Sequence, residues 1–283
     1  MNDYWLALIL GVIEGLTEFL PISSTGHMLL AEQLLDVPLE DGFWKMFTVV
    51  IQLGAILAVV VYYSRRLRDL IADFFAPKRG DGLGPIAPVP RWRHPLVLVL
   101  VAVIPAGAIG VLTKKHIDHL MEHALPVGLA LAVGGVIIEL IERATRGRGW
   151  VEDVSQVSPW QAIAIGFAQA VALIPGVSRS ASTIMGGRLC GVKLRAAADF
   201  SFLLSIPTMF AATGYSLYKH HEPINADQWT VLAIGFVTAF VVALLVVAWF
   251  LHYLRSHSFR LFVVYRIILG LGVIIAWRAG RLK

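Results

Sequence analysis

The sequence predicts an all-α membrane protein that crosses the bilayer many times. Of its 283 residues, 57% are hydrophobic and 15% are charged, and the mean hydropathy is +0.73, which is far from the balance of a soluble domain. A spanning helix needs about 20 mainly apolar residues, and the chain holds several such stretches separated by short polar segments. No long polar insertion interrupts them, so we expect residues 1–283 to form a single membrane domain.

Six segments are long and apolar enough to span a membrane as helices. They are residues 44–63, 96–113, 125–143, 198–218, 229–252 and 258–277.

Two further apolar stretches, 4–35 and 158–192, are broken near the middle. Pro-Ile-Ser-Ser-Thr-Gly (21–26) interrupts the first and Pro-Gly-Val-Ser-Arg-Ser (175–180) the second. Each half is too short to cross, and irregular backbone at membrane depth occurs only where protein or trapped water satisfies its polar groups. We therefore expect two re-entrant helix-loop-helix hairpins.

The order of segments indicates an internal repeat. One hairpin followed by three spans covers about 1–143, and the same order covers about 158–278. Gly-Val-Ile-Glu (11–14) also resembles Gly-Phe-Ala-Gln (166–169) at matching places in the two hairpins. A hairpin returns to its own side while three spans change sides, so the second repeat is expected to be inverted.

Charge distribution predicts the orientation. Most Lys and Arg residues fall on the side that carries the second hairpin and the loops after the first, third and fifth spans. The positive-inside rule places that side in the cytoplasm of a bacterial inner membrane. Both termini, and the mouth of the first hairpin, are then expected on the outer, periplasmic side.

Several classes of protein are disfavoured by the same composition. The net charge of +5 comes from residues in loops, which set topology, so we expect no nucleic-acid binding. The single Cys190 excludes an intramolecular disulfide framework. The first twenty residues lack a basic start and contain Glu14 and Glu18, so we expect no cleaved signal peptide.

Glu14 and Glu18 are four positions apart and therefore share one face of a helix. A carboxylate inside a membrane is costly, which indicates a functional role. The pair suits either a divalent-cation site or a general base, and the spacing does not separate these roles. The alternative is a helix end at the membrane surface with both carboxylates in water.

Hydroxyl and imidazole groups follow at once, because Ser23, Ser24, Thr25 and His27 surround the break. A hydroxyl nucleophile needs a neighbouring base, and both imidazole and carboxylate are available here. One of the three hydroxyls could instead cap the second half-helix.

The second hairpin places Arg179 between Ser178 and Ser180 in its loop. A guanidinium matches phosphate oxygens, and the N-terminus of a half-helix adds free N–H groups, so this loop predicts an anion site. Alternatively, Arg179 pairs with Glu14 or Glu18 across the two hairpins.

Other polar residues carry weaker predictions. Thr48 and Gln52 share a face of the first span and either line the same cavity or join helices. Arg266 lies deep in the sixth span and needs a polar partner that the sequence does not identify. We interpret the histidines at 116, 119 and 123 as solvated residues of an outward loop.

Three separated motifs resemble those of undecaprenyl-pyrophosphate phosphatases of the bacitracin-resistance type. They are Glu-Gly-Leu-Thr-Glu-Phe-Leu-Pro-Ile-Ser-Ser-Thr-Gly-His (14–27), Val-Ile-Gln-Leu-Gly (50–54) and Pro-Gly-Val-Ser-Arg-Ser (175–180). They follow the family's order, and the resemblance covers essentially the whole chain. It implies an enzyme that hydrolyses undecaprenyl pyrophosphate to undecaprenyl phosphate, recycles the lipid carrier for peptidoglycan synthesis and confers bacitracin resistance.

The resemblance also implies roles for particular residues. The family's acidic pair falls on Glu14 and Glu18, its loop hydroxyl and histidine on Ser24 and His27, and its phosphate-binding arginine on Arg179. A divalent cation, magnesium or calcium, is implied as well. Many relatives carry an acidic residue where this chain has Thr48, on the face that Thr48 shares with Gln52.

These inferences combine into one expected mechanism. The prenyl tail stays among the membrane lipids, and the pyrophosphate enters an outward cavity between the two loops, with a cation held by Glu14 or Glu18. Ser24 attacks the terminal phosphorus while Glu18 or His27 accepts its proton; attack by water or by His27 stays open. The residues expected to contact the substrate are Arg179, Ser178, Ser180, Ser23, Thr25 and Gln52.

A transporter or flippase of polyprenyl phosphate lipids is the alternative, because inverted repeats with broken helices are also typical of secondary transporters. The concentration of hydroxyl, imidazole, carboxylate and guanidinium groups at the loops favours the enzyme. The small residues Gly128, Gly134 and Gly135 permit close packing within one chain or in a homodimer.

Overall fold

The computed structural model describes residues 2–38, 42–76, 90–121, 123–219 and 224–282, and this part of the chain is helical and contains no β-strand. Six of its helices are long and apolar enough to span a membrane, as the sequence predicted. They are α3 (Gly42–Tyr62), α5 (Pro95–Met121), α6 (Ala124–Ala144), α9 (Leu194–Lys219), α10 (Ala226–Tyr253) and α11 (Arg260–Arg278).

Two pairs of shorter helices occupy the broken apolar stretches. They are α1 (Asp3–Thr17) with α2 (Ser24–Leu34), and α7 (Pro159–Val171) with α8 (Arg179–Leu189). None reaches the length of about 20 residues that a span needs. The predicted helix breaks are therefore confirmed.

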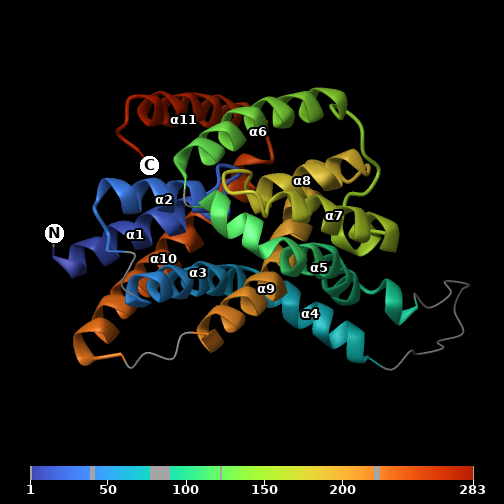
Figure 1. The fold of residues 1–283 in the computed structure, drawn as a ribbon. Coiled ribbons are helices and arrows are strands. Elements are labelled where there is room, and N and C mark those ends of the chain that lie inside the picture. The colour runs from blue at the N-terminus through green and yellow to red at the C-terminus, as the bar shows by residue number, and fades with distance from the viewer. Residues whose placement is uncertain (1, 39–41, 77–89, 122, 220–223, 283) are drawn as a thin grey trace, which may run out of the picture.

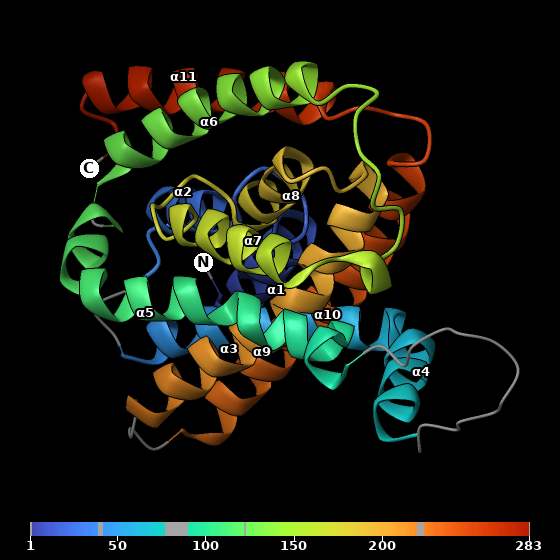
Figure 2. The ribbon, with the colours of Figure 1, turned by 90° about the vertical axis from the view of Figure 1, so that its right-hand side faces the viewer.

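The two short pairs lie in the middle of the molecule. Figures 1 and 2 show them between two sets of long helices, with α6 and α11 on one side and α3, α5, α9 and α10 on the other. Helix α1 packs on α10, α7 packs on α5, and α8 packs on α9. The loops that interrupt the pairs are thus enclosed by protein.

Two local predictions were wrong. The basic segment after α3 is a helix, α4 (Ser64–Phe75), rather than a loop. Its 12 residues mix charged and apolar side chains and contain no apolar run long enough to mark a helix. His116 and His119 lie in the last turns of α5 rather than in a loop.

Glycines allow α1, α3 and α10 to approach closely. A Cβ added at Gly54 of α3 would collide with the backbone oxygen of Phe236 in α10. A Cβ at Gly11 of α1 would lie 2.7 Å from the backbone oxygen of Gly235, also in α10. Because backbone atoms cannot move away as a side chain can, Gly54 and Gly11 set how closely α3 and α1 approach α10.

The glycines of α6 serve contacts within the chain. Gly128 lies against the backbone oxygen of Gly270 in α11, and Gly135 lies against that of Val263. Glu142, near the end of α6, accepts hydrogen bonds from the backbone N–H of Phe259, at 3.2 and 3.1 Å, and so caps α11. The contacts of Gly128, Gly135 and Glu142 therefore hold α6 against α11.

We predict that Gly54→Ala lowers the Tm, because the added methyl group meets backbone rather than a side chain; overpacking of this kind costs about 1–3 kcal/mol. Gly107→Ala is the matched control, since a Cβ there meets no atom within 4 Å. It should leave the Tm unchanged or raise it, because alanine favours a helix over glycine by about 1 kcal/mol. Equal shifts of the Tm in the two purified variants would contradict the close α3–α10 contact.

Candidate active site

The carboxylate of Glu18 joins the two helix breaks. Ser24, the first residue of α2, donates its hydroxyl to Oε2 of Glu18. Arg179, the first residue of α8, donates to Oε1 from Nη2 at 2.9 Å. Glu18 itself directly follows α1 and is 7% exposed. One buried carboxylate thus brings together a hydroxyl and a guanidinium that are 155 residues apart in the numbering.

Two serines in strained backbone precede these helices. Ser23 has φ 73° and Ser178 has φ 78°, a region that residues other than glycine rarely occupy and that costs about 1–3 kcal/mol. Each is an N-cap: Ser23 Oγ accepts from the N–H of Gly26 at 3.3 Å, and Ser178 Oγ accepts from that of Ala181 at 3.3 Å. Such strain is concentrated at functional sites, and here the same geometry occurs in both hairpins.

Arg179 keeps unused donors. Its side chain is 12% exposed, its Cζ lies 5.9 Å from the ring centre of Phe19, and Nε and Nη1 meet no hydrogen-bond acceptor among the described residues. Buried guanidinium donors without partners are costly. These donors, beside the N-terminus of α8, match the needs of an anion.

Glu14 is fully buried on α1, one turn before Glu18. Neither of its carboxyl oxygens has a hydrogen-bond partner in the described part of the chain. The charges of Glu18, Arg179 and Glu32 act on it electrostatically. A hard cation prefers such oxygen ligands, so the donor chemistry fits magnesium or calcium, although no group of three or more potential ligands surrounds a common point among the described residues.

Both ring nitrogens of His27 are engaged. Nδ1 lies 2.7 Å from the backbone oxygen of Ser23, and Nε2 lies 2.6 Å from the hydroxyl of Tyr265 on α11. A carbonyl oxygen can only accept, so Nδ1 carries the proton and, in the neutral ring, Nε2 accepts from the tyrosine. In this arrangement the hydroxyl of Ser24 is hydrogen-bonded to Glu18, while His27 donates to the carbonyl of the strained Ser23.

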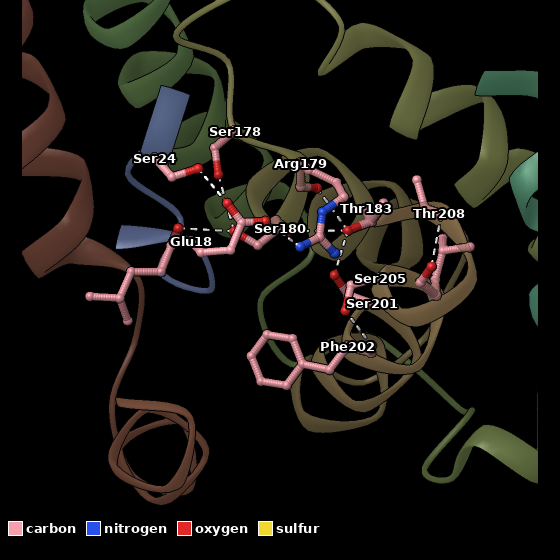
Figure 3. A network of polar contacts seen from close by, with 12 residues as sticks. Glu18, Ser24, Ser178, Arg179, Ser180, Thr183, Ser201, Phe202, Ser205 and Thr208 are labelled. Atoms are coloured by element: carbon pink, nitrogen blue, oxygen red, sulfur yellow. Dashed lines mark hydrogen bonds and ion pairs between the residues drawn. The ribbon is translucent and has the colours of Figure 1, made fainter. Parts of the chain in front are cut away.

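The second hairpin continues the polar network toward α9. Ser180 is fully buried and donates to the backbone oxygen of Leu20 at 2.9 Å, which ties the second hairpin to the first loop. It also lies 3.0 Å from the hydroxyl of Ser178. Thr183 donates to the backbone oxygen of Arg179 at 2.8 Å and contacts Ser201 of α9. Figure 3 shows these contacts running from Ser24 and Glu18 through Arg179 to Ser201.

The remaining candidates stay predictions. Thr25 is half-buried in the first turn of α2, and Gln52 is half-buried on α3. Thr48, one turn before Gln52, donates to Glu32 of α2 at 3.0 Å. The carboxylate that faces this part of α3 therefore comes from Glu32.

Sequence reasoning missed Glu32 and Tyr265. Glu32 is 9% exposed in an otherwise apolar stretch, and the cost of a carboxylate there was the signal that could have found it. Tyr265 carried no such signal, because a tyrosine in a span is common at membrane interfaces. Only its contact with His27 reveals it.

Known proteins match this chain over nearly its whole length. Residues 7–272 match the family described as "Bacitracin resistance protein BacA". A protein of Koribacter versatilis (strain Ellin345) named undecaprenyl-diphosphatase is 42% identical, with 99% of this chain and 100% of the relative covered. The undecaprenyl-diphosphatase of Aquifex aeolicus (strain VF5) is 45% identical over 94% of this chain and 96% of its own. That of Nitrosomonas europaea is 46% identical over 97% and 94%.

The extent of these matches includes both hairpins, and therefore Glu14, Glu18, Ser24, His27 and Arg179. The family resemblance inferred from the three motifs is thus confirmed, and the chain belongs to the bacitracin resistance protein BacA family.

Proposed function

We propose that this protein hydrolyses undecaprenyl pyrophosphate to undecaprenyl phosphate and inorganic phosphate, and that it thereby recycles the lipid carrier for peptidoglycan synthesis and confers bacitracin resistance. The observation that carries the proposal is Glu18, whose two oxygens bind the hydroxyl of Ser24 and the guanidinium of Arg179. A hydroxyl that is hydrogen-bonded to a carboxylate base, beside a guanidinium with unpartnered N–H donors, is suited to phosphoryl transfer. The activity is also the printed name of relatives that match almost the entire chain.

The phosphate groups bind between the helix breaks. Nε and Nη1 of Arg179 are the free donors. The N–H groups of the first two residues of α2 and α8 add to them, because they have no acceptor within their own helix, whereas those of Gly26 and Ala181 are capped. The N-terminal ends of both helices also favour negative charge. Ser23, Thr25, Ser178, Ser180 and Gln52 line this region as substrate-binding residues.

The reaction begins at Ser24. Its oxygen attacks the terminal phosphorus while its proton passes to Oε2 of Glu18, to which the hydroxyl is already hydrogen-bonded. The new Ser24–phosphorus bond replaces the bond to the bridging oxygen, which leaves with undecaprenyl phosphate. Glu18 gives the proton that it took from Ser24 to the departing oxygen of undecaprenyl phosphate and is then free to act again. Water attacks the phosphoserine while one of its protons passes to Glu18, and Glu18 returns this proton to the Ser24 oxygen as the phosphorus–oxygen bond breaks, which releases inorganic phosphate and the free serine.

Glu14 is the residue best suited to hold a divalent cation, magnesium or calcium. Its two oxygens are buried and unpartnered, whereas both oxygens of Glu18 are engaged. When bound, the cation would neutralise charge on the phosphate oxygens.

The hairpins enter the membrane from opposite faces as halves of an inverted repeat, about 1–143 and about 158–278. The support is the matching geometry at Ser23 and Ser178, each a strained N-cap after a short helix. The phosphate site and both termini face the periplasmic side of the inner membrane, which the excess of basic residues on the opposite side supports. The prenyl tail remains in the lipid.

The first test is phosphate release from undecaprenyl pyrophosphate in detergent by Ser24→Ala, Glu18→Gln and Arg179→Ala. We expect losses of at least about 10²-fold in kcat for each, typical of removing a nucleophile, a general base or a transition-state donor. Ser256→Ala and Arg143→Ala are matched controls, because both side chains are exposed and bond only to neighbours. If the wild type releases no phosphate with any cation, lipid flipping becomes the function to assay.

The second test concerns the cation. Glu14→Gln preserves shape and removes one charge, so the magnesium or calcium concentration for half-maximal activity should rise by about 10-fold or more. Glu152→Gln, a change at an exposed carboxylate that pairs with Lys193, should leave that concentration unchanged. Loss of kcat in Glu14→Gln with an unshifted cation midpoint would contradict the assignment.

A further inference from the structure

Arg266 of α11 is fully buried between the two hairpins. Nη1 donates to the backbone oxygens of Pro21 and Val177, both at 3.0 Å. Nη2 donates to those of Gly176 at 3.0 Å and Ala130 at 3.1 Å. The side chain therefore holds the loop of each hairpin and also α6.

Three of these acceptors, the oxygens of Pro21, Gly176 and Val177, lie in the loops, where no helix provides a donor, whereas the oxygen of Ala130 lies within α6. Pro21 lies two residues before the strained Ser23, and Gly176 and Val177 directly precede the strained Ser178. Unpaired carbonyls at membrane depth cost several kcal/mol each. A guanidinium carries five N–H donors in one plane and can serve four acceptors at once, whereas a lysine ammonium has three donors on a single atom.

No carboxylate in the described part of the chain pairs with Arg266, whose neighbours are carbonyl oxygens. A buried charge held only by backbone dipoles is costly. Nη1 and Nη2 are both occupied by these carbonyl oxygens, and only Nε has no acceptor among the described residues. Its contribution is therefore to the positions of the two loops.

The rest of the structure makes room for this contact. A Cβ at Gly134 of α6 would collide with Nη2 of Arg266, so a side chain at 134 would displace the guanidinium. The preceding residue, Tyr265, reaches the first hairpin through His27, which in turn holds the carbonyl of Ser23. Consecutive residues of α11 thus contact both sides of the break in the first hairpin.

We infer that Arg266 is a positioning residue, which locks the two loops together so that Ser24, Glu18 and Arg179 meet in one site. The inference rests on the proposed function for its catalytic consequence. The loop contact itself is independent of the reaction, so the tests below include a measurement without turnover.

The kinetic test is Arg266→Lys, with Arg260→Lys as the control because Arg260 is exposed at the start of the same helix. We expect kcat per folded molecule to fall by about 10²-fold, the loss that a displacement of about 1 Å produces, while KM stays within about twofold because Arg266 does not reach the substrate. When Arg266→Lys is added to Arg179→Ala, the additional fall in kcat should be much smaller, because Arg266 acts through the position of Arg179 and its neighbours, and the two effects are then not additive. An increased KM would instead indicate substrate binding, and an unchanged kcat with a lowered Tm would indicate stability alone; either result overturns the inference.

Gly134→Ala displaces the guanidinium without removing its charge, and it covers the case in which Arg266→Lys fails to fold. It should show the same fall in kcat at nearly constant KM. Gly272→Ala on α11, where a Cβ meets no atom within 4 Å, should behave as the wild type. Wild-type kcat in Gly134→Ala would contradict the role of Arg266.

The measurement without turnover is the distance between spin labels at Leu34 and Leu189, introduced as cysteines in a Cys190→Ser background. These residues lie at the exposed ends of α2 and α8, 72% and 61% exposed. We expect one narrow distance distribution in the otherwise unchanged protein and with Arg260→Lys, and a broader one with Arg266→Lys and Gly134→Ala. An unchanged distribution overturns the inference even if the protein hydrolyses no pyrophosphate.

Discussion

The structure depends on one constraint, the need to satisfy the backbone polar groups of two broken helices in the interior of the protein. Where α1 gives way to α2, and α7 to α8, the chain loses the internal hydrogen bonds that make a helix tolerable in a membrane. Ser23 and Ser178 cap the N-termini that follow, and Arg266 binds carbonyls of both loops. The enclosing helices make this arrangement possible, because α6 and α11 close over the loops.

The same breaks create the chemistry. Each interruption exposes a helix N-terminus, which attracts anions, and the first residue of each new helix is placed at that end. In α2 this residue is Ser24 and in α8 it is Arg179. Glu18 lies at the end of α1 and contacts both. Two helix ends that meet thus bring together a hydroxyl, a carboxylate and a guanidinium, which we propose as the nucleophile, its base and the group that binds phosphate.

The two pairs of short helices are similar in backbone and different in side chains. Each has a strained serine before its second helix, and each carries a buried polar residue without a partner among the described residues, Glu14 in the first pair and Gln169 in the second. The first pair carries the carboxylates, the imidazole and Ser24, and the second carries the guanidinium of Arg179. Because these groups are divided between the pairs, the proposed site requires a contact between the two loops, and a residue that holds both loops affects the whole site.

The sequence by itself determined the all-helical membrane class, the six long helices, the two breaks and most of the reactive residues, because long apolar runs, prolines and costly polar groups are local features. Only the tertiary structure decided which groups meet. That Glu18 pairs with Arg179, that Glu32 faces Thr48 and that His27 binds Tyr265 follow from packing between segments far apart in the chain. The partners of Arg266 were hidden for the same reason, since they are backbone oxygens, which every residue possesses and no sequence pattern distinguishes.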